Sequence, residues 1–198
     1  AEQGLQFGRI IAAKALGIEV PGITINRYCA SGLESIAMAT AKIRTGMADC
    51  IIAGGTESMS MVPTAGWKTV PAYSIAKDEP DFYLSMGLTA EAVAKEYSVT
   101  REDQDAFALA SHQKAKQAID NGHFKKGILP IEITETYLNE NNKKATRNFI
   151  VDTDEGVRAD TTLEALAKLK PAFALKGTVT AGNSSQTSDG ASFVVVMS

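Results

Sequence analysis

Residues 24–39 read TINRYCASGLESIAMA, and this stretch decides how the chain is interpreted. A short apolar run, GITIN (22–26), leads through Arg27 and Tyr28 to Cys29. The residues that follow are small, and the spacing of apolar residues then becomes helical. The chain has only two cysteines, and this one stands where a predicted strand turns into a predicted helix.

Three elements are predicted around this cysteine. Residues 22–26 are typical of a strand, and residues 30–45 of a helix that ends at Gly46. DCIIAGG (49–55) is typical of a buried strand. This order of strand, helix and strand indicates a βαβ unit, so we expect a parallel sheet.

Beyond Gly55 the chain leaves this core. Residues 56–84 contain three prolines and are predicted to be irregular, and 128–134 is predicted to be an edge strand because it contains Pro130. Residues 135–160 are polar and predict loops or a hairpin. Further helices are predicted at 5–16, 89–98, 100–121 and 161–169. Because residues from 177 onward regain strand character, we predict an α/β core sheet with an inserted helical and loop domain.

Composition excludes several classes of protein. The 198 residues carry a formal net charge of -3 at pH 7, which argues against a nucleic-acid binder with a basic surface. No apolar run reaches the roughly 18 residues of a membrane span, and no signal segment is evident. No Gly-rich nucleotide loop or metal-ligand spacing occurs, so neither a metal nor a tightly bound cofactor is expected. A cytoplasmic location is the expectation.

Both ends of the chain indicate a fragment of a longer protein. The chain opens with Ala1 rather than Met, and it closes on the apolar run GASFVVVMS. A strand this apolar is typical of burial on both faces, and no cover for it is evident in the sequence.

Two interpretations of Cys29 are open. At the start of a helix, free N–H groups and the helix dipole favour a thiolate, which is the nucleophilic form of cysteine. The small neighbours Ala30, Ser31 and Gly32 leave room for a substrate. The alternative is a buried, small apolar residue. Cys50 lies inside an apolar strand, and there core packing is expected.

A nucleophilic cysteine needs a base, and the chain has only two histidines. His112 lies within the predicted helix 100–121, off its apolar face, and His123 follows the glycine that ends this helix. Both are predicted to be surface residues. The catalytic base is therefore expected outside this chain.

Three long segments resemble the thiolases. Residues 26–60, NRYCASGLESIAMATAKIRTGMADCIIAGGTESMS, resemble the segment that carries their nucleophile. Residues 85–115, SMGLTAEAVAKEYSVTREDQDAFALASHQKA, resemble their loop domain. Residues 158–192, RADTTLEALAKLKPAFALKGTVTAGNSSQTSDGAS, resemble the return to the core.

The resemblance implies a thiolase fold, of which this chain is most of the first half. The incomplete N-terminal core would comprise residues 1–58 and 188–198, and the inserted loop domain residues 59–187. The family's activating His, acid–base Cys and water-holding Asn belong to the half outside this chain.

The resemblance also assigns roles to single residues. Cys29 matches the cysteine that becomes acylated. Residues that match the lining of the coenzyme A site or of the acyl pocket are Arg158, Phe173, Ala181, Ser185 and Met86. Departures from the pattern include Ser85, where some thiolases have His, and Gln186, where biosynthetic types have Gly. For Phe173 and Ala181, simple packing is the alternative.

The implied activity is thiolytic cleavage of 3-ketoacyl-CoA to acetyl-CoA and a shortened acyl-CoA, with coenzyme A as a substrate, as in fatty acid β-oxidation. YCASG and NSSQTSDG resemble the degradative type more than acetoacetyl-CoA thiolases (acetyl-CoA C-acetyltransferases), which remain an alternative. A second alternative is a fragment that only binds coenzyme A or dimerises, and a third alternative is a ketoacyl synthase. The family implies a homodimer or homotetramer.

Overall fold

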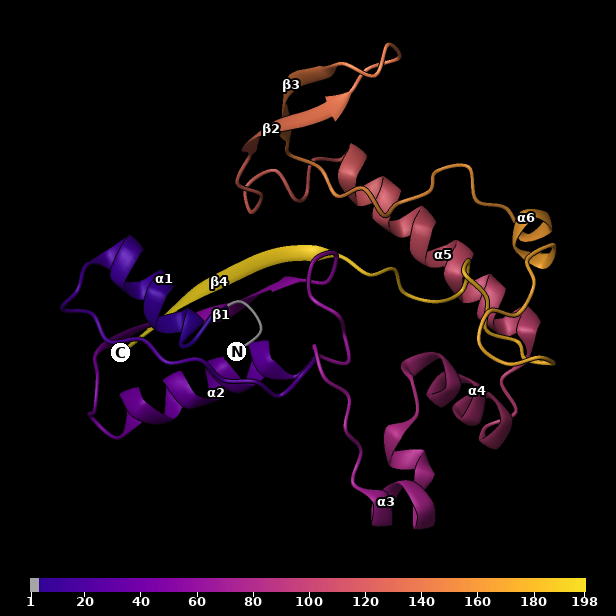
Figure 1. The fold of residues 1–198 in the computed structure, drawn as a ribbon, viewed down its shortest axis with the longest axis horizontal. Helices are drawn as coiled ribbons and strands as arrows, with labels where there is room; N and C mark the ends of the chain where they lie inside the picture. The colour runs from indigo at the N-terminus through magenta and orange to yellow at the C-terminus, as the bar shows by residue number, and fades with distance from the viewer. Residues whose placement is uncertain (1–3) are drawn as a thin grey trace. The chain divides into compact units, whose positions relative to one another are not determined.

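A computed structural model describes residues 4–198 and confirms the predicted α/β class (Figure 1). Its elements in chain order are α1 (Phe7–Leu16), α2 (Ser31–Arg44), β1 (Cys50–Ser58), α3 (Tyr73–Asp78), the 3-10 helix η1 (Pro80–Tyr83), α4 (Met86–Glu96), α5 (Arg101–Asp120), β2 (Ile131–Leu138), β3 (Lys144–Val151), α6 (Leu163–Ala167) and β4 (Asp189–Met197). No helix within residues 4–198 combines the length and the apolar composition that a membrane crossing requires.

The chain divides into two compact units. The first comprises the described residues up to Tyr73 together with Thr187–Ser198, and the second comprises Ser74–Gln186. The chain therefore leaves the first unit once and returns to it at its end. The domain boundaries expected from the sequence, at residues 58/59 and 187/188, stay a prediction.

The first unit is built on an antiparallel strand pair. β1 and β4 pair over their full lengths, from Cys50 opposite Met197 to Ser58 opposite Asp189, and Figure 1 shows them side by side. Helix α2 packs against both strands. The buried hydrophobic residues among the described part of this unit are Ala39 of α2 and Ala53 of β1.

The predicted burial of Cys50 is wrong, because this residue is exposed. Its strand, β1, pairs with β4 alone within the described residues, and α2 is the helix that packs on the pair. A two-stranded sheet of this kind leaves much of its surface open. Phe193 and Val195 of β4 are exposed for the same reason.

The predicted strand at 22–26 and the parallel βαβ unit are also wrong. Residues 22–26 form no ladder, and the one ladder of β1 is antiparallel. The segment lies instead against the start of α1, where the Gly8 N–H donates to Thr24 Oγ1 at 2.8 Å and the Thr24 N–H to Gln6 Oε1 at 3.1 Å. The Thr24 N–H is therefore taken by a side chain at the start of α1 rather than by a neighbouring strand.

The predicted helices are confirmed, and their ends follow local chemistry. Helix α5 begins with a capping box, in which the Thr100 side chain accepts from the Asp103 N–H and the Asp103 side chain accepts from the Thr100 N–H. It is followed by Gly122 at a φ of 69°, which favours glycine. The region 56–84, predicted to be irregular, also contains α3 and η1.

The second unit contains a hairpin, the helices α4, α5 and α6, the 3-10 helix η1, and all of α3 but its first residue. β2 and β3 pair antiparallel from Ile131 opposite Val151 to Leu138 opposite Lys144, which confirms the predicted strand and hairpin. Helices α5 and α6 are in contact. The buried residues of the described second unit are Ala94, Asp105, Leu166, Val179 and Thr180.

Candidate functional site

Cys29 lies on the turn that leads into α2. Ala30 is the N-terminal cap residue of this helix, which begins at Ser31, and the side chain of Cys29 is exposed. The preceding residue, Tyr28, has a φ of 50°. A bulky residue rarely adopts this left-handed conformation, so the surrounding turn must hold it in place.

Side chains that precede and follow Cys29 in the sequence hold this turn. The Tyr28 N–H donates to Asn26 Oδ1 at 2.9 Å. The Arg27 N–H donates to Ser31 Oγ at 2.7 Å, and Ser31 Oγ in turn donates to the Tyr28 carbonyl at 2.7 Å. An ion pair between Arg27 and Glu34 ties the turn to the first turn of α2. The backbone around Cys29 is thus constrained by its own neighbours.

This geometry suits a nucleophile better than a core residue. The thiol of Cys29 is open to an electrophile, and it lies beside the start of α2, where the helix dipole favours negative charge, although the N–H groups of Ala30 and Ser31 are donated to the Arg27 and Tyr28 carbonyls. Cys50 is also exposed, but it begins a strand and has no such helix start beside it. Both cysteines are therefore exposed, and they differ in that one precedes a helix start and the other begins a strand.

Neither histidine lies in the same unit as Cys29. His112 and His123 both belong to Ser74–Gln186. His112, on α5, accepts a hydrogen bond at Nδ1 from the Arg158 N–H at 3.2 Å, so its role in the structure is to hold that loop. His123 is exposed.

The five residues expected to line a coenzyme A site all lie in the second unit. Met86 and Phe173 are neighbours there. A Cβ added at Gly87 would come within 2.2 Å of Cδ1 and Cγ of the Phe173 ring, so the ring lies directly on the Gly87 backbone. Both side chains remain accessible, with 73% of Met86 and 43% of Phe173 exposed. Two exposed apolar side chains thus stand at this contact or next to it in the sequence.

The segments that carry Phe173 and Ala181 also run side by side. The Ala172 N–H donates to the Val179 carbonyl at 2.9 Å, and Pro171 and Thr180 form an isolated antiparallel bridge. Ala181 is exposed. The structure therefore brings Met86, Phe173 and Ala181 into one neighbourhood.

Arg158 and Ser185 belong to a second pair of adjacent segments. A Cβ added at Gly156 would come within 2.1 Å of Nε2 of Gln186, so these two residues are in contact. Ser185 donates through Oγ to the Gln186 carbonyl at 3.1 Å. Arg158 and Ser185 are both exposed.

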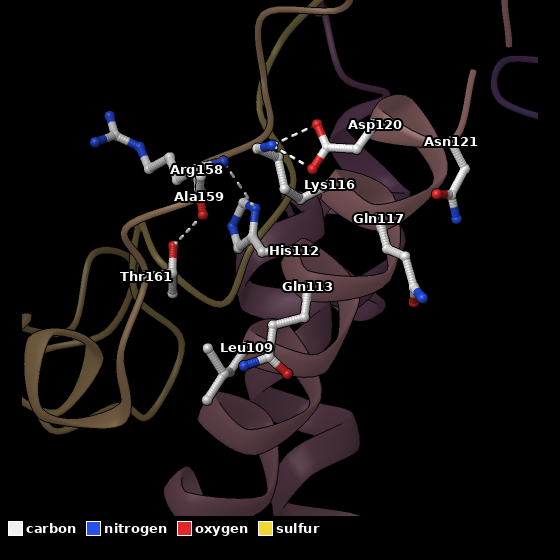
Figure 2. Close-up of a pocket in the computed structure, with 10 residues that line it drawn as sticks. All are labelled: Leu109, His112, Gln113, Lys116, Gln117, Asp120, Asn121, Arg158, Ala159 and Thr161. Carbon is white, nitrogen blue, oxygen red and sulfur yellow. Dashed lines mark hydrogen bonds and ion pairs between the residues drawn. The ribbon is translucent and has the colours of Figure 1, made fainter. Parts of the chain in front are cut away.

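A hollow of about 350 Å³ lies between α5 and the loop at Arg158 (Figure 2). Thr161 Oγ1 donates to the Arg158 carbonyl at 2.9 Å, which closes the loop at this point. Figure 2 shows the Arg158 guanidinium directed away from α5. The cation on the helix side, Lys116, is paired with Asp120. Of the Lys and Arg side chains that line the hollow, one is therefore paired and the other is directed away from α5.

Three further residues emerged only from the structure. Glu91, Asp105 and Asn183 form hydrogen bonds that fix the segment bearing Ala181. The sequence gives little sign of this, because Asn183 stands out only as part of the glycosylation pattern Asn-Ser-Ser. Within residues 4–198, no group of three or more His, Cys, Asp or Glu residues is placed to hold a metal ion.

Comparison with known proteins gives the family of the chain. Residues 1–198 match the family model described as thiolase, N-terminal domain. The chain belongs to the thiolase family. This thiolase chain is 55% identical over its whole length to the 3-ketoacyl-CoA thiolase of Bacillus subtilis, of which it covers 51%.

Two other relatives show the range of names in the family. The thiolase chain is 44% identical over its whole length to an acetyl-CoA acetyltransferase of Pseudomonas aeruginosa, of which the aligned region covers 52%. Over 89% of its length it is 43% identical to the human peroxisomal 3-ketoacyl-CoA thiolase, of which the aligned region covers 41%. The chain thus spans about half the length of the curated relatives it matches, or less.

Proposed function

We propose that the full-length protein carrying this chain is a thiolase-type acyltransferase. It cleaves 3-ketoacyl-CoA with free coenzyme A, and it releases acetyl-CoA and a shortened acyl-CoA. The observation that carries this proposal is the exposed Cys29 at the turn into α2, in a chain of the thiolase family. The name of the Bacillus subtilis relative supports the substrate class.

The reaction divides one difficult step into two. The thiolate of Cys29 attacks the 3-keto carbonyl carbon, and the bond between C2 and C3 breaks. The electron pair of that bond leaves with acetyl-CoA, which takes a proton from an acid–base group expected outside this chain. Coenzyme A gives its thiol proton to that group and attacks the thioester on Cys29. The shortened acyl-CoA departs, and the Cys29 thiolate is restored.

The second unit supplies the proposed contacts to coenzyme A. Met86 and Phe173 offer adjacent exposed apolar surface for the acyl and pantetheine portions. Arg158 offers a guanidinium that is directed away from α5 and can meet a phosphate or stack on an adenine. Ala181 and Ser185 present small groups that let the ligand approach the backbone.

Replacing Cys29 by Ser tests the proposal. In the full-length protein, Cys29→Ser is expected to lower turnover more than about a thousandfold, because the covalent nucleophile is lost. Mass spectrometry of protein quenched after mixing with 3-ketoacyl-CoA, without free coenzyme A, should find an acyl group on Cys29 in the wild type and none in the variant.

The other cysteine of the chain provides the matched control. Cys50→Ser makes the same chemical change at an exposed site on β1, and it should keep both turnover and the acyl adduct. A Cys29→Ser protein that still accumulates the adduct, or a wild-type adduct on Cys50, would refute Cys29 as the nucleophile.

An acetoacetyl-CoA thiolase is the second candidate, favoured by the acetyl-CoA acetyltransferase among the relatives. Comparing kcat/KM for acetoacetyl-CoA with that for longer 3-ketoacyl-CoA substrates separates the two. A homodimer or homotetramer and a cytoplasmic location remain part of the proposal. One of the relatives is named as peroxisomal, so the location needs its own measurement.

A further inference from the structure

The segment that carries Ala181 is fixed at its beginning by Glu91 of α4. The Glu91 carboxylate accepts hydrogen bonds from the Thr178 N–H at 3.0 Å and from the Val179 N–H at 2.9 Å. It also accepts from Thr178 Oγ1 at 3.2 Å. Gly177 is required next to this contact, since a Cβ there would come within 2.0 Å of Glu91 Oε1.

The same segment is fixed at its end by Asn183. Its Oδ1 accepts from the Thr180 N–H at 2.7 Å, and its Nδ2 donates to the Thr178 carbonyl at 3.2 Å. The side chain thus closes a loop over Thr178–Asn183. The second proton of Nδ2 is donated to Asp105 Oδ1 at 2.9 Å.

Asp105 connects this loop to the body of the second unit. It lies on α5 and is only 4% exposed, so its carboxylate must be compensated. Arg101 supplies this compensation through Nε, which donates to Asp105 Oδ2 at 2.8 Å. Arg101 Nη2 also donates to the carbonyls of Leu166 at 2.6 Å and Leu169 at 3.1 Å, and so binds the end of α6.

Packing encloses the hydrogen-bonded side of the loop. Val179 is 4% exposed and Thr180 is fully buried. A Cβ at Gly182 would come within 2.5 Å of both Leu166 Cδ2 and Leu169 Cδ1. Ala181, which directly follows the buried Thr180, is nevertheless exposed. The loop therefore has one face anchored by the network and another face open to a ligand.

We infer that Asp105 and Asn183 are positioning residues for the coenzyme A contact at Ala181. Their hydrogen bond sets the conformation in which Thr178–Asn183 presents its exposed face. The inference rests on the proposed function, because it assumes that this face meets coenzyme A. Neither side chain needs to touch the ligand, and Cys29 belongs to the other unit of the chain.

Asn183→Asp in the full-length protein tests this role. The substitution replaces the donor Nδ2 by a carboxylate oxygen facing Asp105, and two carboxylates at such a distance repel each other. We expect the KM values for coenzyme A and for 3-ketoacyl-CoA to rise about tenfold or more, as the loss of a buried charge-assisted hydrogen bond allows. The kcat at saturation should change less than about twofold.

The rate at which iodoacetamide alkylates Cys29 distinguishes a specific loss of coenzyme A binding from a general disturbance of the fold. Iodoacetamide carries no coenzyme A group, so its rate with Cys29 should be the same in the wild type and in Asn183→Asp. Adding Asp105→Asn to Asn183→Asp restores a donor opposite an acceptor, but an oxygen at position 183 still faces the Thr178 carbonyl, so this double variant should recover part of the lost affinity. Asn148→Asp makes the same change at an exposed site on β3 and should leave KM unaltered.

Three results would overturn the inference. They are a wild-type KM in Asn183→Asp, a slower alkylation of Cys29 in proportion to the rise in KM, or no recovery in the double variant. If Asn183→Asp does not fold, Asn183→Ser removes the same donor without adding charge and carries the same expectation. A wild-type protein without coenzyme A-dependent turnover would instead refute the proposed function, and is seen before any variant is made.

Discussion

Residues within a few positions of Cys29 hold the backbone around it in one conformation. Asn26, Ser31 and the left-handed Tyr28 shape the turn, and α2 begins immediately afterwards. A strained residue beside an exposed thiol is the kind of outlier that occurs at functional sites. The backbone at Cys50 instead takes part in the regular ladder between β1 and β4.

The ionisation of a single residue, Glu91, makes the stability of the second unit depend on pH. Burial raises the pKa of its carboxyl group, but hydrogen bonds from Thr178 and Val179 outweigh this effect and hold the pKa below its ordinary value of 4.5. A group whose pKa is lowered on folding stabilises the protein above its unfolded pKa, and this stability is lost as pH falls through the folded pKa.

Glu91→Gln is therefore expected to destabilise the protein in a pH-dependent way. The amide oxygen can still accept from the Thr178 and Val179 N–H groups, as Oε1 does, but the charge is lost and the NH₂ group that replaces Oε2 cannot accept from Thr178. The difference in free energy of unfolding between wild type and variant should be largest near neutral pH and should shrink as the pH falls from about 5 to 3. Urea titrations across this range measure it, with Glu140→Gln in the exposed β2–β3 turn as the control. A difference that stays constant with pH would contradict the assigned hydrogen bonds.

At the scale of elements, helices follow the sequence closely. Thr100 and Asp103 form the capping box of α5, and the Thr162 side chain caps α6 by accepting from the Ala165 N–H. These contacts span three residues, so sequence alone contains both partners. Strands behave differently, since residues 22–26 have strand-like composition yet form no ladder in the structure.

Thr100→Ala should destabilise the full-length protein by about 1 kcal/mol, the usual cost of removing a helix cap. The N–H of Asp103 then loses its acceptor, and the first turn of α5 frays. Chemical denaturation measures the change in free energy of unfolding. Ser111→Ala, an exposed change within the same helix, should alter stability by less than about 0.5 kcal/mol. Equal effects of the two substitutions would show that the capping box does not stabilise the helix.

At the scale of the whole molecule, the chain is the N-terminal domain of a thiolase and about half as long as its relatives. Its two units divide the proposed chemistry. Cys29 belongs to one unit, and the five residues proposed to contact coenzyme A belong to the other, together with both histidines.

Residues 1–198 produced alone are expected to show no thiolysis of 3-ketoacyl-CoA. A cysteine nucleophile needs an activating base, and neither His112 nor His123 shares a unit with Cys29. The assay follows loss of 3-ketoacyl-CoA after the mass of the 198-residue chain has been verified, with the full-length protein as the positive control. Turnover by the verified chain would place the base within these residues.

The sequence by itself determined the helices, the choice of Cys29 as the candidate nucleophile and the resemblance to the thiolases. These depend on local patterns, in which a residue and its partner lie a few positions apart. Only the tertiary structure decided that β1 pairs with β4, that Cys50 is exposed, and that Glu91 and Asp105 hold the segment around Ala181. The hydrogen bonds of Glu91 and Asp105 to this segment join residues 87 and 78 positions apart, and no local pattern specifies such partners before the chain has folded.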